Sequence, residues 1–256
     1  MNRLIRFFLF SFYFLIPSFV VTAESHFETN VSWSDEFRWN SSVNEKNWNI
    51  EERVCSTESQ VYVKSKENAY CKYGLLHIKC IKRDIKDRKC TSARLNTKGK
   101  QSFLYGKIEV RAKSPVGKGI FTAIWMLPLD SRKPYGELDL MEYIDCWEGK
   151  KIQTNVHVVY EFGVKQYQHQ KKIEIDVAKW HIYSLEWYKD KLVYLVDGNV
   201  VHQLRKDELE AWPFDRPYYL YLNVAFGGWG GSCGIDYDIL PKEMLVDYVR
   251  YYKLKE

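Results

Sequence analysis

Three acidic residues stand close together in segment 136–144, which reads Gly-Glu-Leu-Asp-Leu-Met-Glu-Tyr-Ile. Alternate side chains of a β-strand share a face, so Glu137 and Asp139 point the same way. Glu142 returns to that face only if one extra residue, a β-bulge near Leu140–Met141, interrupts the alternation. Carboxylates this close repel one another, and at least one pKa rises. Retaining glycoside hydrolysis uses such a pair, in which one carboxylate attacks the anomeric carbon and the other exchanges protons.

The same acids also fit a structural role, as the charged outer face of a half-buried strand whose Leu138 and Leu140 point to the core. The surrounding elements therefore matter. The chain predicts short strands at regular intervals and almost no helical periodicity. The expected strands are 60–64, 74–82, 91–96, 104–113, 120–127, 136–144, 152–160, 181–188, 191–197, 199–204, 217–226 and 244–253. Asp197-Gly198 predicts a hairpin turn, and Arg205–Ala211 fits one or two helical turns.

The composition agrees with an all-β protein. The chain has 256 residues, of which 46% are hydrophobic and 28% charged, and these values exclude a disordered protein. Aromatic residues reach 16%, with 9 Trp, 19 Tyr and 13 Phe. They suit pleated sheet and also a surface that stacks on sugars. The strand spacing predicts a sandwich or jelly roll of two antiparallel sheets, in one domain over residues 27–255.

Residues 1–23 are typical of a secretory signal peptide. Arg3 and Arg6 precede a mostly apolar run from Phe7 to Val21, and Val21-Thr22-Ala23 ends in small residues. The run is shorter than the roughly 20 residues of a membrane span, although an uncleaved anchor stays an alternative. Cleavage after Ala23 removes two Arg and lowers the formal net charge from +5 to +3. We therefore expect a soluble chain, secreted or periplasmic, with no nucleic-acid partner and no stable membrane span.

The acidic strand resembles a known family motif. Glu137-Leu138-Asp139-Leu140-Met141-Glu142 looks like the bulged E-x-D-x-x-E signature of glycoside hydrolase family 16, as its laminarinase-like branch carries it. Other segments resemble the family in the same order along the chain. They are Trp33–Phe37, Thr91–Lys98, Tyr105–Arg111, Trp125–Pro128, Trp212–Asp215, Leu222–Gly228 and Val246–Tyr252. The resemblance implies a jelly roll with a glycan cleft on its concave face, and a single catalytic domain at residues 24–256.

The resemblance also assigns roles to the three acids. Glu137 matches the nucleophile and Glu142 the acid/base, while Asp139 lies between them and would steer their protonation and orientation. The implied activity is endo-acting cleavage of a β-glycan by double displacement. Catalysis would need no cofactor and no metal, and the resemblance leaves room for a structural calcium ion. The partner would be an oligo- or polysaccharide, and we expect a monomer.

Eight further residues are expected to contact the glycan. They are Arg94, Trp125, Tyr135, Asn155, His157, Trp229, Glu58 and Gln60. Arg94 falls where the family places a cleft arginine, Tyr135 where relatives often carry an aromatic platform, and Trp229 lies in a glycine-rich loop. The alternatives are a surface ion pair for Arg94, core packing for Trp125 and a structural role for His157.

The substrate stays open at this point. The bulged motif, His157 and the Glu58-x-Gln60 run favour a β-1,3 or mixed β-1,3/1,4-glucan. Phe121 and Thr122 stand where glucan-acting relatives often carry Trp-Pro. This departure leaves an alternative, an endo-β-1,4-galactosidase that acts on poly-N-acetyllactosamine, mucin-type O-glycans or a related galactan. A transglycosylase and a non-catalytic glycan-binding protein are further alternatives, and the presence of all three acids argues against the last.

The six cysteines are expected to form at least one disulfide in an exported protein. No C-x-x-C pair occurs, so a zinc site is not expected. Cys80 and Cys90 flank an expected turn and are the first predicted pair. Cys146 with Cys233 is the second, and it would join two loops of the implied cleft. Sequence alone does not choose among the connectivities.

Overall fold

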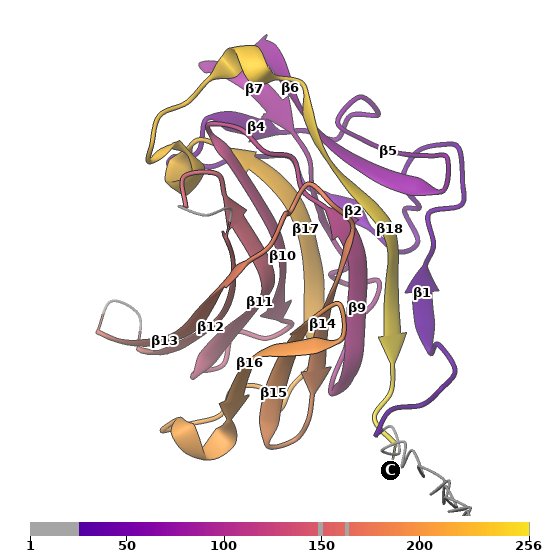
Figure 1. Cartoon of the computed structure of the whole chain (residues 1–256), viewed down its shortest axis with the longest axis vertical. Coiled ribbons are helices and arrows are strands. Elements are labelled where there is room, and N and C mark those ends of the chain that lie inside the picture. Colours follow the sequence, from indigo (N-terminus) through magenta and orange to yellow (C-terminus); the bar gives the residue numbers. More distant parts are fainter. Residues whose placement is uncertain (1–25, 148–150, 162–163, 256) are drawn as a thin grey trace, which may run out of the picture.

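Two β-sheets pack face to face and enclose the core (Figure 1). The computed structural model describes residues 26–147, 151–161 and 164–255. The predicted signal peptide, residues 1–23, lies outside these ranges. No helix within them is long and apolar enough to cross a membrane.

The seven-stranded sheet contains the acidic strand as an interior strand, third from one edge. Its order is β13 (Lys165–Glu174), β12 (Lys151–Glu161), β11 (Tyr135–Ile144), β10 (Ile120–Pro128), β17 (Tyr218–Phe226), β8 (Arg94–Asn96) and β2 (Asn49–Ile50). All neighbouring strands in it are antiparallel. Ile124, Leu138, Val156 and Leu222 are fully buried in the core between the sheets. The alternate side chains therefore lie on the opposite face of this sheet.

The eleven-stranded sheet covers the other side of the core. Its main path is β16 (Asn199–Arg205), β15 (Lys191–Val196), β14 (His181–Trp187), β9 (Gly106–Lys113), β18 (Lys242–Tyr252), β6 (Leu75–Ile85), β7 (Arg88–Ser92), β4 (Gln60–Tyr62) and β3 (Arg53–Val54). Two further strands join it, β1 (Trp33–Asp35) on β18 and β5 (Ala69–Lys72) on β6. Among the named pairs only β4 and β7 run parallel. Val110 and Leu185 contribute to the shared core.

The predicted all-β sandwich is confirmed, and so is the hairpin between β15 and β16. Asp197 and Gly198 both have positive φ, at 51° and 79°, as a two-residue hairpin turn of the I′ type requires. The helical turns expected over Arg205–Ala211 shorten to one 3-10 turn, η1 (Lys206–Glu208). The expected strand 91–96 divides at Ala93, because β7 belongs to one sheet and β8 to the other. This crossing places Arg94 at the start of β8.

Candidate active site

The predicted bulge lies in β11. Against β12, Asp139 faces Asn155 and Glu142 faces Gln153, so β11 places two intervening residues opposite one. The extra residue restores the face that strict alternation would have reversed. Glu137, Asp139 and Glu142 therefore line one cavity.

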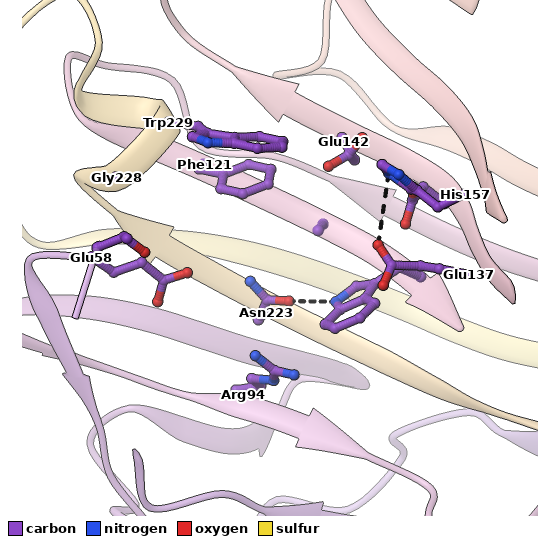
Figure 2. Close-up of a pocket in the computed structure, with 13 residues that line it drawn as sticks. Glu58, Arg94, Phe121, Glu137, Glu142, His157, Asn223, Gly228 and Trp229 are labelled. Atoms are coloured by element: carbon purple, nitrogen blue, oxygen red, sulfur yellow. Dashed lines mark hydrogen bonds and ion pairs between the residues drawn. The ribbon is translucent and has the colours of Figure 1, made fainter. Parts of the chain in front are cut away.

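This cavity has a volume of about 250 Å³ and opens on the face of the seven-stranded sheet that points away from the core (Figure 2). Its lining residues are Thr57, Glu58, Arg94, Phe121, Ala123, Trp125, Glu137, Asp139, Glu142, His157, Asn223, Gly228 and Trp229. Eight of the eleven predicted site residues are thus brought together. The five lining residues that were not predicted to contact the glycan are Thr57, Phe121, Ala123, Asn223 and Gly228. Asn223 follows Leu222 in a segment that resembles the family, and this resemblance was the available signal.

The other three predicted residues do not line the cavity. Gln60 is fully buried, donates from Nε2 to Glu58 Oε2 at 2.5 Å, and accepts a main-chain N–H at 2.8 Å. It therefore positions Glu58 instead of facing the cavity. Asn155 is buried, and its amide hydrogen-bonds to Nε2 of His157 at 2.7 Å. Tyr135 begins β11, two residues before the first acid, outside the cavity lining.

Burial raises the pKa of all three acids. The pKa of Asp139 lies well above its usual value, because the carboxyl is buried and Glu137 repels its charge. The pKa of Glu142 is also well above its usual value, first through burial and then through repulsion from the other two acids. Burial raises the pKa of Glu137, but His157 and Arg94 oppose that rise. Glu142 is therefore better placed to hold a proton, and Glu137 to ionise.

Polar side chains of β12 contact the acids across the strand pair. His157 lies opposite Glu137, with Nε2 at 3.8 Å from Glu137 Oε1 and 3.3 Å from Asp139 Oδ2. Gln153 lies opposite Glu142 and donates from Nε2 to Glu142 Oε2 at 3.1 Å. Gln153 was not among the predicted site residues, although its spacing of four residues from His157 places both on one face of the strand.

Arg94 and Trp125 form a stacked wall on the β8 side of the cavity. Trp125 stacks on Tyr221 with 4.4 Å between ring centroids, and the guanidinium carbon lies 4.8 and 4.4 Å from those two centroids. Arg94 Nε also pairs with Glu51 Oε2 at 3.1 Å. Trp125 Nε1 donates to Asn223 Oδ1 at 2.8 Å. The ion pair considered as the alternative for Arg94 is therefore present. Arg94 and Trp125 nevertheless both line the cavity.

Trp229 and Phe121 stack on one another at the edge of the cavity, with centroids 6.3 Å apart and ring planes inclined by 24° (Figure 2). Trp229 belongs to the 3-10 turn η2 (Gly228–Gly231) and is 63% exposed. An exposed indole beside a polar cavity is suited to stacking on a sugar ring. Phe121 packs against the Trp229 indole. Position 121 therefore keeps an aromatic ring, although the tryptophan that glucan-acting relatives often carry there is absent.

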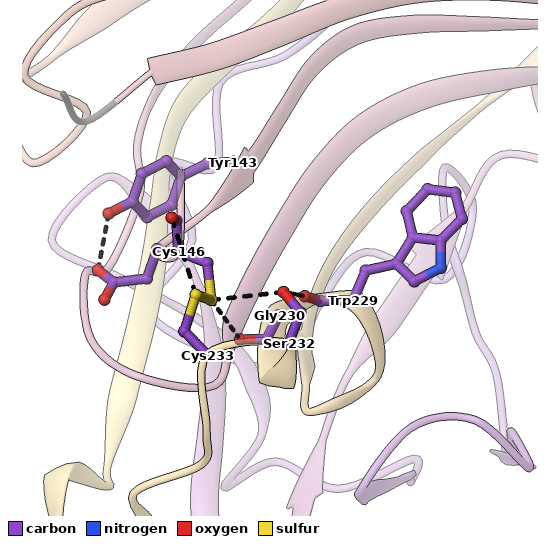
Figure 3. Close-up of a disulfide and its surroundings, with 7 residues drawn as sticks. Tyr143, Cys146, Trp229, Gly230, Ser232 and Cys233 are labelled. Atoms are coloured by element: carbon purple, nitrogen blue, oxygen red, sulfur yellow. Dashed lines mark hydrogen bonds between the residues drawn. A yellow bond between two sulfur atoms is a disulfide. The ribbon is translucent and has the colours of Figure 1, made fainter. Parts of the chain in front are cut away.

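A disulfide between Cys146 and Cys233 joins the segment after β11 to the segment after η2 (Figure 3). This pairing was the second prediction, and it is confirmed. Ser232 Oγ donates to the main-chain carbonyl of Trp229 at 2.8 Å. A Cβ on Gly230 would lie 2.6 Å from a main-chain oxygen, so the turn packs closely on the chain before β10. The disulfide therefore holds the turn that presents Trp229.

The first predicted disulfide, Cys80–Cys90, is wrong, because both residues are free and buried. In the register of β6 and β7, Cys90 faces Lys82 and Thr91 faces Ile81, so Cys80 does not lie opposite Cys90. The pKa of the Cys80 thiol is well above its usual value through hydrogen bonding with Cys90 and through burial. The turn between the strands brings the two thiols together without joining them.

Glycosidase relatives match both the sequence and the structure. Residues 43–250 match the family model described as Glycosyl hydrolases family 16. A β-glucanase of Rhodothermus marinus is 34% identical over 251 residues, which cover 88% of this chain and 85% of the relative. The X-ray structure of the laminarinase from Rhodothermus marinus has a TM-score of 0.82 at 33% identity and covers 90% of this chain and 99% of that one. A structure from work on endo-acting O-glycanases, expressed by prominent members of the human gut microbiota to initiate mucin breakdown, has a TM-score of 0.79 at 26% identity, with coverages of 92% and 94%. This chain therefore belongs to glycoside hydrolase family 16.

Proposed function

We propose that this glycosidase cleaves internal bonds of a β-1,3 or mixed β-1,3/1,4-glucan with retention of configuration. The bulge of β11 carries the proposal, because it brings Glu142 to the face of Glu137. Two carboxylates on one face, with different proton affinities, meet the requirement of a retaining mechanism. Similarity to the β-glucanase and laminarinase of Rhodothermus marinus supports the choice of glucan.

In the proposed mechanism Glu137 is the nucleophile and Glu142 the acid/base. Glu137 attacks the anomeric carbon while Glu142 donates its proton to the leaving oxygen, so the glycosidic bond breaks as an ester to Glu137 forms. Glu142, now ionised, takes a proton from water. As it loses this proton, the water oxygen attacks the anomeric carbon and the ester bond to Glu137 breaks. The sugar is released with its original configuration, and Glu137 is again a carboxylate.

Asp139 is the proposed positioning residue of the pair. It is 2% exposed, and its raised pKa favours the neutral form. A protonated Asp139 adds no second negative charge beside Glu137, so Glu137 can ionise. His157, within 4 Å of both carboxylates, further favours the ionised nucleophile.

An extended binding surface supports endo action. The cavity takes its lining from β8 through β12, and a second cavity of about 300 Å³ continues over β12 and β13. A glycan that crosses the strands would meet Arg94 and Trp125 on one side of the acids and β13 on the other. The test is incubation with laminarin and mixed-linkage glucan, followed by product sizing and proton NMR. Oligosaccharides with a β anomer are expected first; monosaccharide alone, or an initial α anomer, would contradict the proposal.

The second candidate is an endo-β-1,4-galactosidase for poly-N-acetyllactosamine or mucin-type O-glycans. Phe121 and Thr122 favour it, because they replace the usual Trp-Pro, and so does the likeness to the O-glycanase structure. The same incubation includes a lactosamine glycan and a mucin glycan. Fragments from these substrates alone would establish the galactosidase and reject the glucanase.

Hydrolases of this family need no catalytic cofactor. The structural calcium ion stays a prediction. In the described part of the chain, one cluster brings three His, Cys, Asp or Glu ligand atoms within 4.8 Å of one another, and it consists of Glu137, Asp139 and His157. An imidazole nitrogen is not a calcium ligand, and calcium takes six to eight oxygens. These residues therefore do not fit calcium.

We further infer that residues 24–256 form a single exported catalytic domain. The family match at residues 43–250 falls inside these bounds. The Cys146–Cys233 disulfide supports export, because such bonds persist in oxidising compartments. The monomeric state stays a prediction, which sedimentation of the purified chain would test.

A further inference from the structure

A second cavity of about 300 Å³ lies beside the active site, and Trp229 lines both. Its walls include Gln153 and Asn155 of β12 and Gln170 and Lys172 of β13. The proposed mechanism uses none of the β13 side chains. Because Trp229 is largely exposed, a glycan that passes its indole can reach both cavities.

Three cross-strand rows connect the second cavity to the acids. Each carboxylate of β11 faces a polar residue of β12, which faces an amide or amine of β13. The rows are Glu137–His157–Gln168, Asp139–Asn155–Gln170 and Glu142–Gln153–Lys172. Neighbouring strands lie about 4.8 Å apart, so the β13 side chains begin about 10 Å from the acids. A sugar held there lies near the scissile bond without occupying the catalytic position.

The two cavities differ in charge. Four acidic residues line the active-site cavity, Glu58, Glu137, Asp139 and Glu142, and the proposed mechanism needs Glu137 ionised. Its one guanidinium, Arg94, is already paired with Glu51. Among the described residues that line the second cavity there is no Asp or Glu, and the ammonium group of Lys172 is present. An anionic group is therefore repelled by the first cavity and attracted by the second.

Lys172 is available to a ligand. It is exposed, and its Nζ lies 4.7 Å from the ring centroid of Trp147. Within residues 26–147, 151–161 and 164–255, the lysines that form ion pairs with Asp or Glu do not include Lys172. Gln168 is already hydrogen-bonded to Nδ1 of His157 at 2.8 Å. Gln170, two residues from Lys172 and on the same face, is exposed and can donate beside it.

We propose that the second cavity is a subsite for a sugar that carries an anionic oxygen group, either a carboxylate or a sulfate ester. Lys172 pairs with the anion, Gln170 donates a hydrogen bond to it, and Trp229 packs against the sugar ring. The inference rests on the proposed function, because the acids of β11 define where the glycan is cut.

The test compares laminarin with laminarin whose 6-hydroxyls are partly oxidised to carboxylates, and with laminarin partly sulfated at those positions. Lys172→Met should lower the ratio of kcat/KM, anionic over neutral substrate, by about three- to fivefold, the size of one exposed ion pair. Lys172→Arg keeps the charge and should keep the ratio. Lys171→Met is the matched control, because Lys171 points to the opposite face of β13. The carboxylated and sulfated arms show which anion is preferred.

Product sequencing by mass spectrometry adds a readout that general electrostatic attraction would not change. The anionic sugar should be enriched at one of the two new ends formed by each cut, and Lys172→Met should abolish this enrichment. An unchanged ratio in Lys172→Met, or an equal loss in Lys171→Met, would overturn the subsite.

If the wild-type chain cleaves none of the three glucans, the glucanase proposal fails separately. Saturation-transfer NMR with methyl β-glucuronide against methyl β-glucoside then tests the subsite: loss of the glucuronide preference in Lys172→Met supports it, and no preference refutes it.

Discussion

Gln153 lies directly across the strand pair from Glu142 and donates a hydrogen bond to its Oε2 at 3.1 Å. This bond lowers the pKa of Glu142, against the larger effects of burial and of repulsion from the neighbouring acids. Gln153 therefore moderates the rise in the pKa of the proposed acid. A cleft acid with too high a pKa would donate its proton poorly, so this bond bears on catalysis.

Replacing Gln153 with Met should move the alkaline limb of the pH profile of kcat/KM to higher pH. Glu142 acts as an acid only while protonated, so activity falls as pH rises through its pKa. Met removes a donor that favours the charged form, and the pKa rises further. Profiles on laminarin for wild type, Gln153→Met and the control Gln166→Met, a glutamine of β13 outside both cavities, would measure the shift. A limb that stays in place, or moves to lower pH, would contradict the role of Gln153.

Azide should distinguish the two glutamates. Glu137→Ala is expected to lose activity by roughly 10⁴-fold or more, as other nucleophile deletions do, while the protein stays folded. Azide can replace the missing nucleophile by attacking the anomeric carbon once, which gives an α-glycosyl azide. In Glu142→Ala the ester to Glu137 still forms from a substrate with a good leaving group, and azide then gives the β product. The same anomer from both variants, read by proton NMR, would reject the assignment.

Asp139→Asn should stabilise the fold at neutral pH while impairing activity. The native pKa of Asp139 is raised, whereas the unfolded chain has an ordinary carboxyl pKa. Between these two values the native state holds a proton that the unfolded state has lost, so the free energy of unfolding falls as pH rises through that window. Below the ordinary pKa both states are protonated and this contribution disappears. Asparagine removes the titration, so the gain should grow from near zero in acid to about 1–3 kcal/mol at neutral pH.

Urea unfolding at acid and neutral pH would measure this difference. Glu174→Gln, at the exposed end of β13, is the control for removing a carboxylate from the same sheet. It should show no comparable gain. A gain for Asp139→Asn that is the same at both pH values would point to packing and not to the proton.

The acidic strand was predictable because the spacing of its three acids indicates both the reaction and the bulge that the reaction requires. Three acids at spacing two and three can meet on one face only through an extra residue, and the register of β11 contains that residue. Gln153 was not predicted, because an amide in an alternating strand has no signature of its own. Its function depends on the pairing of two strands, and register is set by long-range contacts.

Strand β13 escaped prediction for a related reason. On the face that carries Tyr167 and Ile173, which pack against the core, His169 and Lys171 stand between them, so the apolar alternation that indicates a strand is interrupted. It forms because β12 offers a partner along its whole length. The Cys80–Cys90 prediction was wrong because of strand register as well. The sequence shows that the two cysteines flank a turn, but it does not show that Cys90 pairs with Lys82 and not with Cys80.

The Cys146–Cys233 disulfide should act on substrate binding through Trp229. The double variant Cys146→Ser/Cys233→Ser should raise KM about two- to tenfold and change kcat less, because it releases the turn that presents an aromatic contact of about 0.5–1.5 kcal/mol. Trp229→Ala should have a similar effect. If the disulfide acts through the indole, breaking it in Trp229→Ala should add little. Cys55→Ser changes a free cysteine and is the control. A full additional loss in the combined variant, or a fall in kcat alone, would mean that the disulfide acts through the segment after β11 and the placement of Glu142.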